Sequence, residues 1–157
     1  MTVLGITGPL ASGKSTVLAI LGELGAQTLR ADDISRELLQ PGNPVLEQVR
    51  QAFGDEFFAP DGTLRRPRLA ARIFADPQAR ARLNQIMHPP MTARLRELVD
   101  SYRHQADPPP VVALEAAILH EMGLDRLTDR ILLVTAPEEV RVRRLQARDG
   151  LSEDESR

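Results

Sequence analysis

The sequence predicts an α/β fold in which helices flank a parallel sheet. Short apolar runs of strand type recur along the 157 residues, and helical segments separate them. Strands that alternate with helices favour parallel β–α–β construction. The length and the 42% hydrophobic content are sufficient for one domain with a substantial core.

The first predicted strand covers residues 2–7, a short apolar run with β-branched residues that suits a buried parallel strand. Residues 8–13 follow as a loop of mostly small residues. A helix over residues 14–25 comes next and ends at Gly25, because glycine accepts the backbone conformation that closes a helix.

A shorter and weaker candidate strand covers residues 26–31, and a helix begins at Asp32 and ends at a Pro-Gly pair. Residues 43–104 have a helical, arginine-rich pattern with no convincing strand. The sequence Ala-Pro-Asp-Gly-Thr at residues 59–63 interrupts this pattern and predicts a turn.

A proline-rich break at residues 106–110 precedes two more predicted strands, 111–116 and 130–137. A charged helix and a polar segment complete the chain. We therefore expect a core of residues 1–36 and 106–140, a helical insert of residues 37–105, and a further element that begins in residues 141–157.

Composition excludes several classes of function. A net charge of −2 gives no reason to expect a nucleic-acid or membrane-surface partner, and 3% aromatic residues make base stacking a poor candidate. The chain has no cysteine, which excludes disulfides and thiolate chemistry. Without a long apolar run or a basic N-terminal region, we expect a cytoplasmic protein that is a monomer or a weak homo-oligomer.

Gly8, Gly13, Lys14 and Ser15 match the phosphate-loop pattern G-x-x-x-x-G-K-[ST]. The two glycines allow successive N–H groups to turn inward and, with the N-terminus of the next helix, to cradle phosphate oxygens. The lysine can reach the β- and γ-phosphates, and the serine hydroxyl can bind Mg²⁺. The preceding strand and the following helix are the context that this motif requires.

Lys14 is the only lysine in the chain, and every other Lys or Arg position is arginine. The planar arginine fork is a poor substitute for a point charge inside a tight loop, which supports a phosphate-binding role for Lys14. The alternative is a glycine-rich turn with an exposed lysine. The residues expected to bind the nucleoside triphosphate are Gly8, Ala11, Ser12, Gly13, Lys14, Ser15 and Thr16.

Two aspartates, Asp32 and Asp33, follow the second predicted strand. Carboxylates at the C-terminal end of a parallel strand lie at the ligand-binding edge of the sheet. One of them could accept a proton from an attacking hydroxyl or hold Mg²⁺ through water. Either could instead cap the following helix, and the local sequence does not decide between these roles.

The chain resembles the dephospho-coenzyme A kinase family along essentially its whole length. Shikimate and nucleoside monophosphate kinases share the phosphate loop but lack the central DGTL…IF…LN…HP block, which makes this block the most discriminating part. The resemblance is carried by GITGPLASGKST, ADDISRELLQPG, FGDEFFAPDGTLRRPRLAARIFADPQARARLNQIMHP, EAAILHE and TAPEEVRVRRLQARDGLS.

This resemblance implies a P-loop NTPase core with a helical dephospho-CoA-binding insert and a lid that begins in residues 141–157. It also implies phosphorylation of the ribose 3′-hydroxyl of dephospho-coenzyme A with ATP and Mg²⁺. Family members continue beyond the last residue of this sequence, so we expect the C-terminal part of the family fold to be missing.

The family signature D-A-D-x-x-x-R places its catalytic base at Asp32 and its arginine at Arg36. Arg30 stands where the signature has its first aspartate, and the role of that acid is lost or moved here. Pro9 and Ala11 stand where the family loop usually has glycine, and Pro9 removes one potential amide donor.

The resemblance also places His88 of an H-P pair and the final acid Glu121 near the substrate. Glu115, at the end of a predicted strand, is a candidate acid on the Mg²⁺ side. His88 could instead be a helix-end histidine with structural contacts, and Glu121 a surface charge. The residues expected to bind dephospho-CoA are Thr7, Asp32, Arg36, His88 and Glu121, and those expected to bind the metal are Ser15 and Glu115.

Arg144 and Arg148 match the spaced lid arginines of the family, and their separation of four residues puts them on one helix face. Lid cations could close on the transferring phosphate, whereas the alternative is a solvated pair. Two rival functions remain. One is a small P-loop kinase for a nucleoside monophosphate or metabolite, and the other is a nucleotide-binding regulator without transfer activity, which Arg30 and the early end of the sequence favour.

Overall fold

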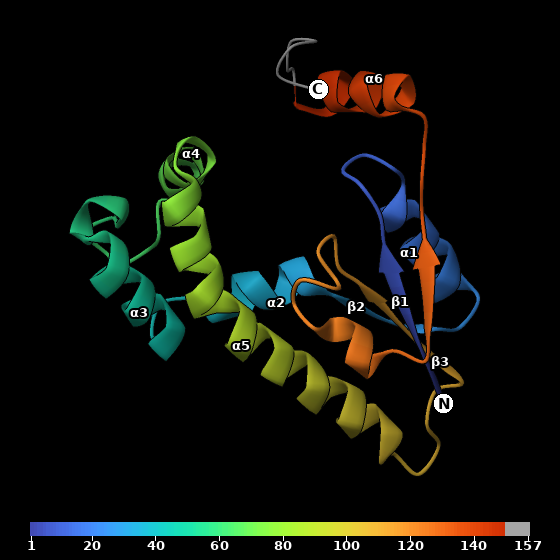
Figure 1. Cartoon of the computed structure of the whole chain (residues 1–157). Coiled ribbons are helices and arrows are strands. Elements are labelled where there is room, and N and C mark those ends of the chain that lie inside the picture. Colours follow the sequence, from blue (N-terminus) through green and yellow to red (C-terminus); the bar gives the residue numbers. More distant parts are fainter. Residues whose placement is uncertain (150–157) are drawn as a thin grey trace. The chain divides into compact units, whose positions relative to one another are not determined.

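Four parallel strands form one sheet in the order β2-β3-β1-β4, as the computed structural model shows (Figure 1). The structure describes the backbone of residues 1–149 and the side chains of residues 1–147. The parallel α/β fold predicted from the sequence is confirmed. The strands are β1 (Thr2–Thr7), β2 (Gln27–Arg30), β3 (Val111–Glu115) and β4 (Arg130–Leu133).

The apolar strands β1 and β3 form the centre of the sheet and of its core. Val3 and Ile6 on β1 are fully buried, and so are the middle residues of β3. Helix α1 (Lys14–Glu23) packs Leu18 against Ile6 and Ala113. Burial on both faces explains why these strands are continuous apolar runs rather than alternating ones.

The carboxyl ends of three strands position the candidate site. The loop that begins at Gly8 follows β1, Arg30 ends β2, and Glu115 ends β3. In the sheet register Glu115 is the partner of Ile6 on one side and of Arg30 on the other. Ligands of open parallel sheets bind at this edge, so the register brings chemically useful side chains to the expected place.

The chain divides into two units, and each is described by itself. The first contains Met1–Arg30 and the chain from Val99 onward, with the sheet, α1, the 3-10 helix η2 (Leu124–Leu127) and α6 (Glu138–Asp149). The second, Ala31–Leu98, consists mainly of helices. Its elements are α2 (Ala31–Leu38), α3 (Pro44–Phe53), η1 (Asp55–Phe57), α4 (Arg66–Ala75) and most of α5 (Pro77–Arg103).

The turn predicted at residues 59–63 is present in the second unit. Gly62 has a φ of 85° and its N–H donates to the carbonyl of Ala59 at 2.9 Å. The Asp61 carboxylate accepts from the N–H of Thr63 at 2.9 Å, and this hydrogen bond lowers the pKa of Asp61. The turn brings Phe58 and Leu64 into an isolated antiparallel bridge, the only β-pairing in residues 31–98.

Helix α5 continues through Pro89 and Pro90, so His88 lies inside a helix and the helix-end alternative is wrong. The prolines lack N–H groups, which costs two helical hydrogen bonds. Met87, Met91 and Leu95 form a buried stripe four residues apart, and this packing favours a continuous helix. Among the described residues, α5 included, no helix combines the length and apolar character needed to cross a membrane.

Candidate functional site

The loop between β1 and α1 has a backbone that depends on glycine. Gly8 has a φ of 150°, and a Cβ at this position would collide with the backbone carbonyl oxygen of Val134. Gly13 has a φ of 107° directly before α1, in the left-handed region that glycine enters without strain. The two fixed glycines of the motif are therefore required by close approach and by backbone angle.

The N-terminus of α1 and the side chain of Lys14 face the same loop. Gly13 provides no side-chain cap, so the first-turn N–H groups of the helix are available for an anion. The Lys14 ammonium is buried and donates to the carbonyls of Gly8 at 2.8 Å and Pro9 at 2.9 Å. A cationic group held over the loop in this way can exchange carbonyl oxygens for phosphate oxygens.

Ser12 and Thr16 provide the remaining hydroxyls of the predicted ATP-binding set. The Ser12 hydroxyl is buried and has no hydrogen-bond partner among the described residues. Thr16 is exposed on the first turn of α1. A buried hydroxyl without a partner is costly in a folded protein, which is consistent with a loop that is completed by a ligand.

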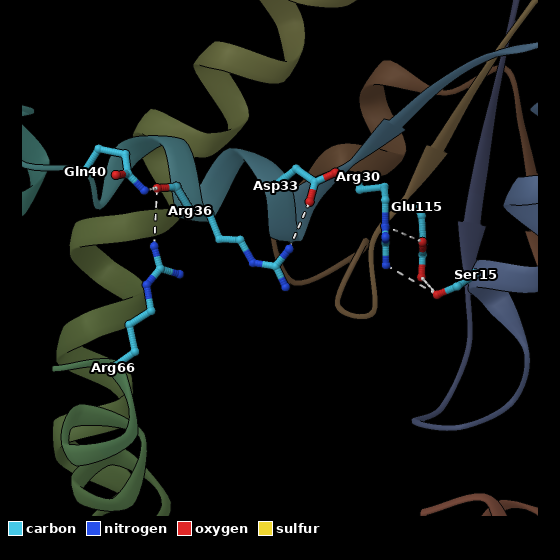
Figure 2. A network of polar contacts seen from close by, with 7 residues as sticks. All are labelled: Ser15, Arg30, Asp33, Arg36, Gln40, Arg66 and Glu115. Carbon is cyan, nitrogen blue, oxygen red and sulfur yellow. Dashed lines mark hydrogen bonds and ion pairs between the residues drawn. The ribbon is translucent and has the colours of Figure 1, made fainter. Parts of the chain in front are cut away.

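Ser15, Glu115 and Arg30 form a polar cluster at the strand ends (Figure 2). The Ser15 hydroxyl donates to Glu115 Oε1 at 3.2 Å. Arg30 Nε lies 3.2 Å from Glu115 Oε2, and Arg30 Nη2 donates to Ser15 Oγ at 3.4 Å. The Glu115 side chain is only 11% exposed, whereas that of Arg30 is 41% exposed.

The donor set of Ser15 and Glu115 fits Mg²⁺. Both groups offer oxygen, and Glu115 Oε2 is buried without a hydrogen bond among the described residues, although Arg30 Nε is close enough for an ion pair. No group of three or more His, Cys, Asp or Glu that could hold a metal occurs in the described part of the chain. Mg²⁺ commonly takes one or two protein oxygens and completes its shell with phosphates and water, which this pair allows.

Arg144 extends from α6 to the phosphate loop. Its Nη1 donates to the carbonyl of Ala11 at 3.0 Å and lies 3.6 Å from the position that a Cβ on Gly13 would occupy. The side chain is otherwise exposed, so it can turn toward a bound phosphate. Arg148 belongs to the same helix, and its side chain lies outside the described residues.

Two predicted substrate residues of the first unit have different environments. The Thr7 hydroxyl is nearly buried and donates to the carbonyl of Ala117 at 3.2 Å, which ties the end of β1 to the segment after β3. Glu121 is exposed in the turn that precedes η2. The structure thus gives Thr7 a contact that holds the site's backbone and leaves the Glu121 carboxylate in solvent.

The other predicted substrate residues belong to the second unit. Asp32 and Asp33 are exposed on the first turn of α2, and Asp33 forms an ion pair with Arg36 at 3.2 Å (Figure 2). The Arg36 carbonyl accepts from Gln40 at 3.0 Å and from Arg66 at 3.4 Å. His88 is half-buried on α5.

From the sequence, Arg30 is only a departure from a family pattern, and its contacts with Glu115 and Ser15 are not predicted. The structure adds it to the site, because strand register places it beside Glu115. The available signal was positional: Arg30 and Glu115 are each the penultimate residue of a predicted strand. In a parallel sheet such ends meet when the strands are neighbours.

Comparisons with known proteins identify the family of this chain. The family described as dephospho-CoA kinase matches residues 2–157. The dephospho-CoA kinase of Moorella thermoacetica is 46% identical over 162 residues, which cover 100% of this chain and 74% of that protein. The enzyme of Anaeromyxobacter dehalogenans is 42% identical over 151 residues, covering 96% of this chain and 71% of that protein.

Two solved structures have a similar fold. TT1252 from Thermus thermophilus superposes with a TM-score of 0.75 and 34% identity, over 99% of this chain and 76% of that one. Dephospho-CoA kinase from Campylobacter jejuni superposes with a TM-score of 0.67 over 98% of this chain and 76% of that one; at 23% identity this likeness shows the fold alone. With the phosphate loop in place and a family match over nearly every residue, the chain belongs to the dephospho-CoA kinase family.

Proposed function

We propose that this protein transfers the γ-phosphoryl group of ATP to the ribose 3′-hydroxyl of dephospho-coenzyme A, the last step of coenzyme A synthesis. The observation that carries the proposal is the family match over residues 2–157. The uncapped N-terminus of α1 and the buried Lys14 ammonium support ATP as the phosphoryl donor.

The phosphate loop binds the ATP phosphates in this proposal. Backbone N–H groups at the N-terminus of α1 receive phosphate oxygens, and Lys14 moves from the carbonyls of Gly8 and Pro9 to the β- and γ-phosphates. The loop residues assigned to ATP are Gly8, Ala11, Ser12, Gly13, Lys14, Ser15 and Thr16.

Ser15 and Glu115 would hold Mg²⁺, directly or through water. When bound, the ion supplies charge neutralisation to the phosphates. The Glu115 carboxylate is nearly buried at the strand edge, and the Ser15 hydroxyl that donates to it is oriented for the same position.

Asp32 is the proposed general base. It takes the proton of the 3′-hydroxyl while the ribose oxygen forms a bond to the γ-phosphorus and the bond from this phosphorus to the bridging oxygen of ADP breaks. Arg36, His88, Glu121 and Thr7 are assigned to dephospho-CoA by the family resemblance. Of these, Thr7 acts through the backbone that its hydroxyl holds.

Arg144 and Arg148 are proposed to stabilise the charge of the transferring phosphoryl group. The bond from Arg144 to the Ala11 carbonyl supports this role, because it keeps a guanidinium at the loop before the nucleotide binds. The family resemblance assigns residues 141–157 to the start of a lid; residues 150–157 lie outside the part of the chain that the structure describes.

Residues 37–105 are proposed to bind the coenzyme. This segment is rich in arginine. One pocket of about 440 Å³ in it is lined by two arginines, two phenylalanines and two acids, namely Arg72, Arg82, Phe53, Phe57, Glu56 and Asp76, and Asp76 pairs with Arg72 at 3.0 Å. Arginine beside aromatic rings suits a phosphorylated ligand with a stacking group. We also place the reaction in the cytoplasm, where ATP is supplied, with the protein as a monomer or weak homo-oligomer.

The proposal is tested by mass spectrometry of the products that the purified protein forms from ATP, Mg²⁺ and dephospho-CoA. We expect 3′-phosphorylated coenzyme and an equal amount of ADP. AMP and CMP serve as rival acceptors in parallel reactions, and faster turnover of either would indicate another P-loop kinase. ATP binding without any product would identify the regulator instead, the alternative that Arg30 in place of the family's first aspartate favours.

A further inference from the structure

The Arg30 guanidinium lies beside both oxygen ligands that the proposed function assigns to the divalent cation. Its Nε lies 3.2 Å from Glu115 Oε2, and its Nη2 donates to Ser15 Oγ at 3.4 Å. The contact follows from the fold, since Arg30 and Glu115 are register partners at the ends of β2 and β3. Figure 2 shows the guanidinium alongside both groups.

This arrangement sets two cations in competition for one carboxylate. A guanidinium is always protonated in proteins, so Arg30 cannot yield the position by losing its charge. A metal ion that approached Glu115 would meet a like charge within a few ångströms, in a place where water screens weakly because the carboxylate is nearly buried. The metal can bind only when Arg30 moves away.

The ion pair is also incompletely formed. Neither Arg30 Nε nor Glu115 Oε2 makes a hydrogen bond within the described residues, although both atoms are buried. These two buried atoms lie at ion-pair distance without an aligned hydrogen bond, so their attraction is mainly electrostatic. The more exposed part of Arg30 is free to turn toward another anion, and phosphate is the partner that matches its fork best.

We propose that Arg30 is an internal counter-ion that closes the metal position at Glu115 and Ser15 in the nucleotide-free protein. Nucleotide phosphates draw its guanidinium away, so the divalent cation enters with the nucleotide and not before it. The proposal rests on the proposed function for the identity of the metal ligands. It gives the arginine at the end of β2 a role in the order of binding.

The test uses Mn²⁺ as the probe, because it takes the same oxygen ligands as Mg²⁺ and is paramagnetic. Mn²⁺ is titrated into the nucleotide-free protein, and free Mn²⁺ is measured by electron paramagnetic resonance. Removing the competing charge in Arg30→Gln should tighten Mn²⁺ binding about tenfold relative to the unchanged protein. An unchanged or weakened affinity overturns the proposal.

Three further variants separate this effect from simpler ones. Arg103→Gln removes the same charge from an ion pair of the same 3.2 Å length, with Asp100, and should leave the Mn²⁺ affinity unchanged. The double variant Arg30→Gln/Glu115→Gln should lose the gain. A gain that persists in the double variant, or that Arg103→Gln reproduces, overturns the proposal. Arg30→Met also removes the charge and keeps an unbranched apolar side chain, and it replaces Arg30→Gln if circular dichroism shows the latter to be unfolded.

The outcome is independent of catalysis, since neither nucleotide nor coenzyme is present in the titration. If the unchanged protein forms no coenzyme product but Arg30→Gln binds Mn²⁺ more tightly, the proposed function is refuted and the counter-ion role of Arg30 is supported. A protein that forms product but shows no gain refutes the counter-ion alone.

Discussion

Asp32 and Asp33 are adjacent carboxylates with different surroundings. Both are exposed on the first turn of α2, where a negative charge is favoured by the helix dipole. Asp33 is engaged by Arg36 at 3.2 Å, which leaves Asp32 as the better candidate to receive a proton. Asp33 therefore serves as a control for the proposed role of Asp32 as the general base.

Replacing Asp32 by Asn should lower kcat by about 10²- to 10⁴-fold, the usual contribution of a positioned general base. The KM for ATP should change little, because the phosphate loop is untouched. Steady-state kinetics of the purified variants measures both quantities. Asp33→Asn, which makes the same chemical change one residue later, should retain most of the activity.

Equal losses in the two variants would assign the effect to the charge or structure of the α2 N-terminus and not to proton transfer. The sequence alone left this choice open, because two consecutive aspartates after a strand satisfy the patterns of a helix cap and of a base equally. The ion pair to Arg36 gives the two aspartates different surroundings, and it depends on side-chain positions that no local pattern specifies.

The phosphate loop stores strain at Ala11. This residue has a φ of 58°, and it is the only non-glycine with a positive φ among the described residues. The left-handed conformation costs a residue with a Cβ about 1–2 kcal/mol. The strain explains why glycine suits this loop position, as the family pattern suggested.

Ala11→Gly should raise the free energy of unfolding by about 0.5 kcal/mol, since the relief of strain exceeds the entropy that glycine adds to the unfolded chain. Urea denaturation measures the change. Ala19→Gly, in the exposed interior of α1, is the matched control and should lower stability by about 1 kcal/mol. A loss in Ala11→Gly as large as that of Ala19→Gly would contradict the assignment of strain.

At the level of elements, apolar composition predicted the strands well and their ends less well. The expected strand over residues 130–137 ends at Leu133 as β4. The reason is its neighbour: β1 ends at Thr7, which pairs with Leu133 and accepts one last hydrogen bond from Val134 at 2.8 Å. Where a strand ends depends on the length of its partner, which the strand's own residues do not encode.

The contact between Arg30 and Glu115 could not be predicted from the sequence, because it also depends on which strands are neighbours. The two residues are far apart in the chain and meet because β2 and β3 are neighbours in register. Strand order in a parallel sheet is set by the packing of the crossover segments, not by the strand sequences. By contrast, Lys14 could be placed from the sequence, because its motif is contiguous and specifies both flanking elements.

On the scale of the whole molecule, the assigned groups are divided between the two units. The loop, Ser15, Glu115 and Arg144 belong to the first unit, whereas Asp32, Arg36 and His88 belong to the second. The proposed donor-side groups can therefore be tested apart from the acceptor side. Nucleotide binding is the measurement that does so, because it requires no coenzyme.

A non-hydrolysable ATP analogue with Mg²⁺ should stabilise the whole protein against thermal unfolding, by about 2.7 kcal/mol when the ligand is present at a hundred times its Kd. Lys14→Ala should lose most of this shift, because the buried ammonium donates to two carbonyls of the loop that is proposed to bind the phosphates. Differential scanning calorimetry with and without the analogue measures the shift.

Lys14→Arg tests whether this position requires lysine in a chain whose other Lys or Arg positions are all arginine. The compact ammonium donates to two loop carbonyls, at 2.8 and 2.9 Å, in a nearly buried space that a planar guanidinium does not fit. We expect Lys14→Arg to lose the ligand-induced shift almost as fully as Lys14→Ala, while Arg103→Gln retains it. A full shift in Lys14→Arg would mean that positive charge alone suffices at this position, and that the lysine is not retained for its geometry.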